Sequence, residues 1–302
     1  MIDVILALDA GGTKTKVAAI DNNKRVVFET VSYEESLTGN VSSVISHLFS
    51  LVKTYVKIVE KEYRIVEIII GLSGYSTLDN SGKIEIEFQD TFQIKTTIIS
   101  DTKLGIYSII KDQASEGIMV LAGTGSAVVG IQNYKTLLVG GWGHLLEEKG
   151  SSYSAVMRVI LNAIHNYDLG VECSNLQKSL MRRVGISSPN GFRVFVYKST
   201  KKEIAALAVH ISEEAKAGNE EAILLLKQCG GDLADLVMTV KGRLGLSGLV
   251  HLGFVGSFVQ KAPFVKEEIL ERLKSQHIDY IEVETEDPIF GAYYMYKRRN
   301  LC

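Results

Sequence analysis

The chain has 302 residues and a formal net charge of −2, with 46% hydrophobic and 23% charged residues. This length suits two domains of ordinary size, and the composition is typical of a folded globular protein. No long run of Lys and Arg is present, so the electrostatic footprint of a nucleic-acid-binding protein is missing.

The cysteines and the chain start bear on cofactor and compartment. Cys173, Cys229 and Cys302 lie far apart and form no C-x-x-C pair, which argues against a zinc or iron–sulfur site within one chain. Isolated thiols are typical of a reducing compartment. The sequence has neither a signal-peptide pattern at its start nor an apolar run of about 18 residues. We therefore expect a cytoplasmic protein with no membrane contact.

The first predicted elements are short strands joined by a glycine-rich bend. Val4–Leu8 is an apolar run ending at Asp9, and Lys16–Ile20 follows the bend. A turn at Asn22-Asn23 precedes a further strand at Val26–Phe28. This pattern predicts an antiparallel meander.

Helices and strands alternate along the rest of the first half. Val41–Tyr63 has apolar residues at helical spacing, with Asn40 as a candidate N-cap. Lys83–Phe88 alternates like a strand, although its place in the chain suits a helix, and both readings stay open. Ile94–Ser100 is a predicted strand, and a helix is expected at Thr102–Gln113.

The second half opens as the first does. An apolar run from Met119 leads into Gly123-Thr124-Gly125-Ser126 and then into a strand at Ala127–Ile131. Helices are expected at Ser151–Asn166, Glu203–Ala217, Glu220–Gly242, Phe264–Gln276 and Ile289–Arg299. The alternation of strands and helices predicts an α/β fold.

An internal repeat relates the two halves. At an offset of 111 residues, Gly12-Thr13 falls on Gly123-Thr124 and Asn22 falls on Asn133. A looser echo links IIIGLSGYS at 68–76 with VHLGFVGS at 250–257. Two echoes in matching order predict two related domains.

The two glycine loops are candidate phosphate-binding sites. Gly11 and Gly12 allow the backbone to approach an anion closely, Thr13 adds a hydroxyl donor, and Asp9 at a strand end is placed to hold Mg²⁺. Either loop alone is better explained by a simple hairpin turn. One loop in each half, however, could grip the phosphates of one nucleotide, which favours ATP. No P-loop and no dinucleotide-binding motif occurs.

A series of motifs resembles a known family. DAGGTKTK at the start, GLSG at 71–74, Asp101, AGTGS at 122–126 and GGWGH at 140–144 occur in that order, followed by Gly256-Ser257 and PIFGA at 288–292. The series is similar, over essentially the whole chain, to the N-acetylglucosamine kinase branch of the BadF/BcrA-type ATPases. The resemblance implies two ribonuclease H-like (actin-like ATPase) domains with a cleft between them. The expected boundaries are 1–115, joined by the C-terminal helix 288–302, and 116–287.

The resemblance also implies roles for matching residues. Gly11, Gly12, Thr13 and Lys14 would form the first phosphate loop, with Gly123, Thr124 and Gly125 as the second; Gly256 and Ser257 would contact adenosine, and Asp9 the metal. Asp101 corresponds to the catalytic aspartate, against the simpler reading of a helix N-cap. Asn40, Ser73, Gly74, Asp101, Trp142 and Glu148 would line the sugar site; for Asn40 a helix cap is an equal alternative, and for Trp142 simple packing.

One departure concerns the sugar. After GGWGH the family usually continues to Gly-Asp-Glu-Gly-Ser, whereas this chain has Glu147-Glu148-Lys149-Gly150-Ser151. The sugar-contacting carboxylate would be Glu148, one methylene longer than Asp, so the pocket is expected to differ in shape and charge.

The function expected from these observations is transfer of the ATP γ-phosphoryl group to a hexose or amino sugar of the N-acetylglucosamine, glucosamine or glucose type, at the 6-hydroxyl. ATP and Mg²⁺ are the expected cofactors, and a homodimer is allowed because relatives often pair. The alternatives are a BadF-type ATPase activator, whose paired cysteines are lacking here, and a non-catalytic sugar or nucleotide sensor.

Overall fold

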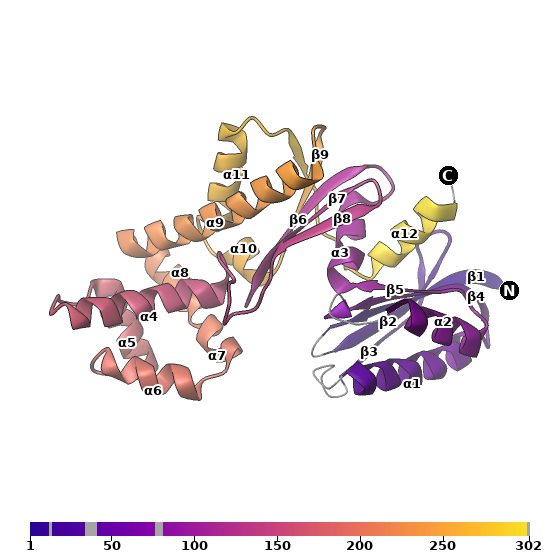
Figure 1. Ribbon diagram of the computed structural model, residues 1–302, viewed down its shortest axis with the longest axis horizontal. Coiled ribbons are helices and arrows are strands. Elements are labelled where there is room, and N and C mark those ends of the chain that lie inside the picture. Colours follow the sequence, from indigo (N-terminus) through magenta and orange to yellow (C-terminus); the bar gives the residue numbers. More distant parts are fainter. Residues whose placement is uncertain (12–13, 34–40, 76–80, 301–302) are drawn as a thin grey trace. The chain divides into compact units, whose positions relative to one another are not determined.

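The computed structural model describes residues 1–11, 14–33, 41–75 and 81–300. The predicted site residues Gly12, Thr13 and Asn40 therefore lie outside the described residues. The chain divides into two compact units (Figure 1), which are Met1–Ser115 together with Glu284–Cys302, and Glu116–Val283.

The first unit contains a five-stranded sheet in the order β3-β2-β1-β4-β5, in which β1 is antiparallel to β2 and parallel to β4. Its elements are β1 (Ile2–Ala10), β2 (Thr15–Asp21), β3 (Val26–Ser32), α1 (Val41–Val59), β4 (Tyr63–Leu72), α2 (Ser81–Phe92), β5 (Thr96–Ser100), α3 (Asp101–Ile110) and α12 (Phe290–Asn300).

Both faces of the central strand β1 are buried, because successive side chains of a strand point to opposite faces. Leu6 and Leu8 pack with Leu48 and Val52 of α1. Ile5, one residue out of phase, is 1% exposed and belongs to the opposite face. Helices α1 and α2 lie on one side of the sheet and α3 and α12 on the other (Figure 1). The C-terminal helix therefore completes the fold of the N-terminal sheet.

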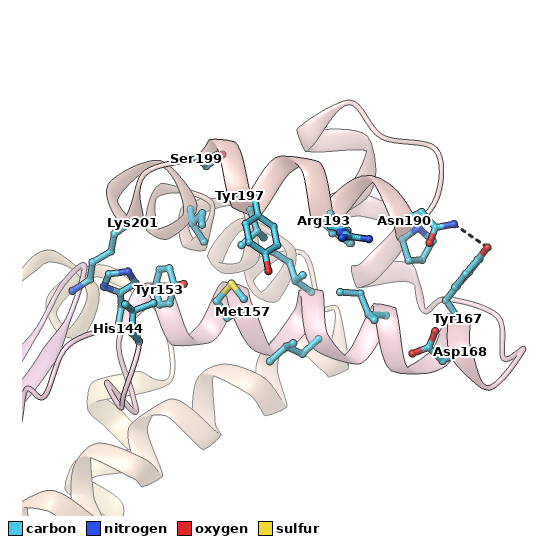
Figure 2. Close-up of a pocket in the computed structure, with 18 residues that line it drawn as sticks. His144, Tyr153, Met157, Tyr167, Asp168, Asn190, Arg193, Tyr197, Ser199 and Lys201 are labelled. Carbon is cyan, nitrogen blue, oxygen red and sulfur yellow. Dashed lines mark hydrogen bonds between the residues drawn. The ribbon is translucent and has the colours of Figure 1, made fainter.

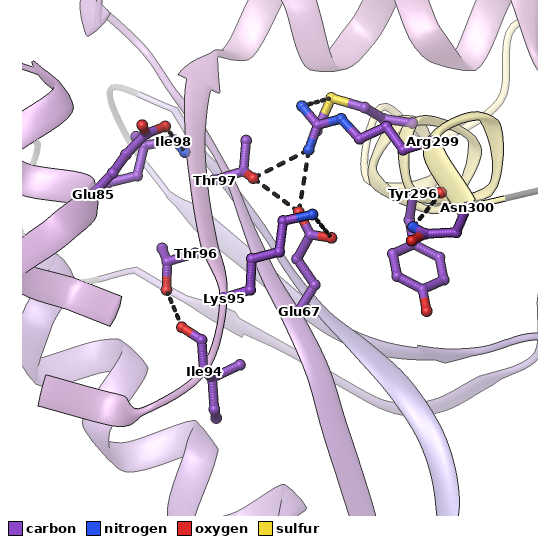
Figure 3. Close-up of polar contacts among 11 residues, drawn as sticks. Glu67, Glu85, Ile94, Lys95, Thr96, Thr97, Ile98, Tyr296, Arg299 and Asn300 are labelled. Atoms are coloured by element: carbon purple, nitrogen blue, oxygen red, sulfur yellow. Dashed lines mark hydrogen bonds and ion pairs between the residues drawn. The ribbon is translucent and has the colours of Figure 1, made fainter. Parts of the chain in front are cut away.

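A buried carboxylate ties α12 to this sheet (Figure 3). Glu67 in β4 is 1% exposed and accepts hydrogen bonds from Lys95 at 3.1 Å, Thr97 at 2.8 Å and Arg299 at 3.1 Å. A buried charge is tolerated when it is paired and hydrogen-bonded. Arg299 thus links the last turn of the helix to the centre of the sheet.

The second unit also contains five strands, in the order β10-β9-β6-β7-β8. Its elements are β6 (Glu116–Ala122), β7 (Ser126–Gln132), β8 (Lys135–Gly140), α4 (Ser152–Asp168), α5 (Asn175–Val184), α6 (Asn190–Lys198), α7 (Lys201–Ala206), α8 (Ala208–Lys216), α9 (Glu220–Leu244), β9 (Val250–Val255), α10 (Ser257–Lys261), α11 (Val265–Ser275) and β10 (Tyr280–Glu282).

The long helix α9 packs directly on β7 of this unit. A Cβ atom placed on Gly130 would lie 2.2 Å from Val240 and 2.8 Å from Leu244, so the glycine is what allows the helix to approach the strand so closely. The core of the unit joins α4, α9 and α11 to the sheet.

The predicted α/β class with two ribonuclease H-like sheets is confirmed, and both sheets have the same strand order and directions. The strands of the looser echo, β4 and β9, occupy equivalent positions beside β1 and β6. The open segment Lys83–Phe88 is helical, and the single helix predicted at 203–217 is divided into α7 and α8. No helix among the described residues is long and apolar enough to span a membrane.

Candidate active site

Two predicted site residues of the first unit lie at the carboxyl ends of parallel strands. Asp9 is the penultimate residue of β1, and Asp101 follows β5 as the first residue of α3. The alternative reading of Asp101 as the helix N-cap is wrong, because the N-cap is Ser100, whose hydroxyl accepts a hydrogen bond from the Lys103 N–H at 3.0 Å. The Asp101 carboxylate is therefore not needed as the cap.

Burial perturbs both carboxyl groups, and repulsion from neighbouring carboxylates adds to its effect at Asp9. Burial first, and then the negative charges of Asp101 and Asp287, raise the pKa of Asp9 to about 6. Burial also raises the pKa of Asp101, while hydrogen bonds from the Thr102 N–H and the Ser73 hydroxyl act against it. Perturbed carboxylates that gather at strand ends are typical of a functional site.

A third carboxylate at this place was not predicted. Asp287 accepts a hydrogen bond from Lys16 Nζ at 2.7 Å, and Lys16 also lies 2.9 Å from Glu29. The sequence signal was available, because Asp287 directly precedes the late PIFGA motif. Lys16 follows the first glycine loop, so this ion pair joins the loop to the returning chain.

The described part of the first glycine loop is held by two backbone hydrogen bonds. The Gly11 N–H donates to the Lys14 carbonyl at 3.1 Å, and the Ser73 N–H donates to the Ala10 carbonyl at 2.9 Å. Lys14 is exposed. The structure therefore brings Asp9, Ser73 and Asp101 together beside the first loop, with the exposed Gly74 next in the chain.

The second glycine loop lies between β6 and β7. The Gly123 N–H donates to the Gly125 carbonyl at 2.9 Å, and the Gly123 carbonyl accepts from both the N–H and the hydroxyl of Ser152. Among the described residues, the N–H groups of Thr124 and Gly125 have no hydrogen-bond partner. These two amides, rather than that of Gly123, are the donors free for an anion.

Gly256 follows the strand next to this loop and fits it closely. Its φ is +110°, and an added Cβ atom would lie 2.4 Å from the Ala122 carbonyl oxygen. Gly74 occupies the corresponding place after β4 and also has a positive φ of 75°. The position of Gly256 requires glycine, and that of Gly74 favours it.

A pocket of about 470 Å³ adjoins the second glycine loop. Thr124 and Ser257, two predicted nucleotide-site residues, belong to its lining. The remaining lining residues are Ser152, Lys202, Ala205, Ala206, Ala208, Val209, Ser212, Glu213, Lys216, Phe258, Lys261 and Ala262. The lining combines six apolar side chains with eight polar or charged ones, three of which are lysines, and this mixture beside the phosphate loop suits a nucleotide. Lys202 was not predicted as a site residue, because in the sequence it appears only as part of the Lys201-Lys202 pair.

Glu148 is buried beside the same loop and paired with a lysine that was not predicted. Its side chain is 8% exposed, and its carboxylate oxygens lie 2.8 Å and 2.7 Å from Lys201 Nζ. Oε2 still has no aligned hydrogen-bond donor among the described residues. A Cβ atom on Gly125 would lie 2.7 Å from this carboxylate.

The side chain of Trp142 is 71% exposed, so the alternative that it serves packing is not supported.

The arrangement has counterparts among known proteins. A family model described as the BadF/BadG/BcrA/BcrD ATPase family matches residues 6–293. A kinase from Clostridium acetobutylicum named for N-acetylmuramic acid and N-acetylglucosamine is 22% identical over 95% of this chain and 96% of its own length. An N-acetyl-D-glucosamine kinase of Dictyostelium discoideum is 21% identical, with 96% of each chain covered. A solved structure from Chromobacterium violaceum, described as a candidate N-acetylglucosamine kinase, superposes with a TM-score of 0.67 at 18% identity and covers 96% of this chain and 98% of its own.

Proposed function

Because the chain belongs to the BadF/BadG/BcrA/BcrD ATPase family, we propose that it is an ATP-dependent kinase that phosphorylates an amino sugar at its 6-hydroxyl. The observation that supports this most directly is that the half-buried Asp101, hydrogen-bonded by Ser73, lies at the strand ends of the sheet that carries Asp9. The two relatives named above are sugar kinases, and their sequences match this chain over nearly their whole length. This similarity agrees with the proposed chemistry.

The second unit has residues that are suited to binding ATP. The free amides of Thr124 and Gly125 can receive phosphate oxygens, and the pocket that Thr124 and Ser257 line can hold the adenosine. Gly256 keeps its backbone against the loop where any side chain would collide with Ala122. In the first unit, Gly11, Gly12, Thr13 and Lys14 are proposed as the second set of phosphate contacts.

Magnesium fits the first unit. Mg²⁺ is usually held by one or two carboxylates together with substrate phosphates and water. Burial and the negative charges of Asp101 and Asp287 raise the pKa of Asp9, and a bound cation would offset this repulsion. We propose Asp9 as the metal-site carboxylate, acting directly or through water. When bound, the ion neutralises charge on the transferred phosphoryl group.

Asp101 is proposed as the general base. Its carboxylate would accept the proton of the sugar hydroxyl as the P–O bond forms. The Thr102 N–H donates to Oδ1 at 2.7 Å and the Ser73 hydroxyl supplies a second hydrogen bond, so the carboxylate is held in one orientation. Burial raises its pKa, which makes it a stronger base than a solvated aspartate.

Glu148 is proposed to recognise sugar hydroxyls. Its carboxylate lies beside the second glycine loop, 2.7 Å from Lys201 Nζ, and carboxylate oxygens accept hydrogen bonds from hydroxyl groups. Trp142, exposed in the same loop, can stack on an apolar sugar face. Asn40 and Gly74 complete the proposed sugar contacts.

Further proposals follow from the family. The chain would fold as two domains, 1–115 with 288–302 and 116–287, and would act in the cytoplasm as a homodimer. Light scattering of the purified protein tests the dimer. An ATPase activator is not favoured, because the curated relatives named above are sugar kinases and Cys229 is fully buried within the core of the second unit.

The decisive experiment is a coupled ADP-release assay with MgATP against N-acetylglucosamine, N-acetylmuramic acid, glucosamine, glucose and a no-sugar control. We expect ADP release that depends on an N-acetylated sugar, and mass spectrometry of the product should place the phosphate at the 6-position. ADP release without sugar would instead indicate an ATPase. Nucleotide binding without turnover would indicate a sensor.

A further inference from the structure

A long groove in the second unit has no role in the function proposed so far. Its volume is about 770 Å³, and it runs between α4 and α6 (Figure 2). The floor is one face of α4, with Tyr153, Met157, Leu161 and Ile164 at successive helical turns. The lining of the groove on α4 extends from Tyr153 to Asp168, which at 1.5 Å per residue is a length of about 22 Å.

The two ends of the groove are polar and its middle is apolar. His144 and Lys201 stand at one end, and Asp168, Asn190 and Arg193 at the other (Figure 2). Between them, Met157 and Leu161 face the groove from α4, together with Phe192, Val196 and Tyr197 of α6. Leu161 is 56% exposed and Tyr197 is 86% exposed, so a ligand in the groove would remove apolar surface from water.

The first end is continuous with the proposed sugar site. Lys201 lines the groove and its Nζ lies 2.7 Å from Glu148 Oε2. His144, four residues before Glu148 in the same loop, packs edge-on against Tyr153 with ring centroids 5.2 Å apart. A sugar bound at Glu148 would therefore have the mouth of the groove beside it.

The lining selects the chemistry of the occupant. A second sugar ring would bring several hydroxyl groups that need partners. In the middle of the groove Met157, Leu161 and Val196 offer none, and Tyr197 offers a single hydroxyl. An alkyl chain needs no partners and gains free energy from every methylene that it buries. The volume also exceeds what an N-acetyl group can fill and lies in the range of pockets for whole small molecules.

We propose that the groove is a subsite for the acyl substituent of the sugar, so that the preferred substrates are N-acyl amino sugars with chains longer than acetyl. This inference rests on the proposed kinase function and adds the substrate class. The amide of the sugar would lie at the polar mouth formed by His144 and Lys201, and the chain would extend along α4 towards Tyr167.

The test measures kcat/KM by ADP release for N-acetyl-, N-butanoyl-, N-hexanoyl- and N-octanoylglucosamine. An open groove would bury about half of each methylene. We therefore expect kcat/KM to rise about twofold per methylene, on the order of 50-fold from N-acetyl- to N-octanoylglucosamine. Leu161→Glu places a charge in the groove and should reduce this rise to less than about fivefold, with the N-acetyl value changed by less than about twofold. Leu224→Glu is the matched control, because Leu224 is also a helical leucine, 58% exposed, but lies outside the groove.

The outcomes separate this inference from the kinase proposal. Phosphorylation of N-acetylglucosamine with equal kcat/KM along the series would overturn the acyl subsite alone, whereas no phosphorylation of any sugar would overturn both. Equal effects of the two Glu substitutions would also overturn it. A third outcome would also overturn it: kcat/KM does not change along the series, and light scattering shows that Leu161→Glu converts a dimer into monomers. The groove would then be a contact surface between copies of the chain.

Discussion

The charge of Asp101 acts on the carboxyl group of Asp9, although 91 residues separate the two in sequence and they belong to different strand ends. β1 and β5 both run parallel to β4, so their carboxyl ends meet at one edge of the sheet. Two carboxyl groups that repel each other in a partly buried place form a site that a cation would stabilise.

The Asp101→Asn variant is expected to lose activity without losing its fold. Loss of a general base lowers kcat by about 10²- to 10⁴-fold, while the amide can keep the hydrogen bond from the Thr102 N–H through its oxygen. ADP-release kinetics and nucleotide binding by calorimetry are the measurements, with Asp90→Asn on α2 as control. A kcat close to that of the unchanged protein would exclude Asp101 as the base.

The Asp9→Asn variant is expected to be more stable than the unchanged protein at neutral pH. The folded-state pKa of Asp9 is about 6, against an ordinary value of 3.8 for aspartate. The folded state therefore holds the proton more tightly, and stability is lost as the pH rises through 6. The amide removes this loss, so unfolding of the variant should need about 2–3 kcal/mol more at pH 8.

The same two proteins should converge at acid pH. Below about pH 4 the aspartate is protonated in both the folded and the unfolded states, and the difference in stability disappears. Thermal unfolding from pH 4 to pH 8 measures the effect. A difference that did not change with pH would show that the substitution acts through packing and not through the charge.

Gly256→Ala should damage the second glycine loop. The alanine methyl group would meet the Ala122 carbonyl at 2.4 Å and would impose a φ of +110° on a residue that disfavours it. We expect a loss of stability of about 2–4 kcal/mol and weaker ATP binding. Gly82→Ala is the control, because its Cβ meets nothing within 4 Å. Calorimetric titration with ATP and urea unfolding would show whether only the first variant is affected.

Arg299→Met is expected to loosen α12 from the N-terminal sheet. Arg299 is 34% exposed, and its removal leaves Glu67, which is 1% exposed, with Lys95 as its remaining cation. We expect a cost of about 1–3 kcal/mol and faster hydrogen exchange of the β4 amides. Lys297 lies on the same helix as Arg299 and forms an exposed ion pair with Asp112. Lys297→Met breaks this pair and should cost less than about 1 kcal/mol. Equal costs would contradict the role given to Glu67.

The repeated glycine loops and the α/β class could be predicted because they depend on local signals. Apolar runs bounded by Gly-Gly-Thr and Gly-Thr-Gly specify hairpins, and both hairpins are present. The helices α5 and α6 were not predicted, although Ser174 and Gln177 form a capping box at the start of α5.

Long-range pairing left weaker signals in the sequence. Lys201 and Glu148 are 53 residues apart, and Lys16 and Asp287 are 271 residues apart. No local rule relates the members of such pairs, so only the folded chain shows that they meet. The groove along α4 was not predicted either, because its second wall is the helix α6, which the sequence analysis missed.

The discontinuity of the first unit sets an order for its synthesis. The sheet begun at Met1 is completed only by Glu284–Cys302, after the whole of Glu116–Val283 has been made. At 5–20 residues per second, roughly ten to forty seconds pass on the ribosome between Ser115 and the last residue. During that time the face of β1 and β4 that α12 will cover has no C-terminal helix to shield it. A nascent chain of this design therefore has a built-in period of aggregation risk, and a premature stop near the end of the message would leave the first half of the protein unfinished.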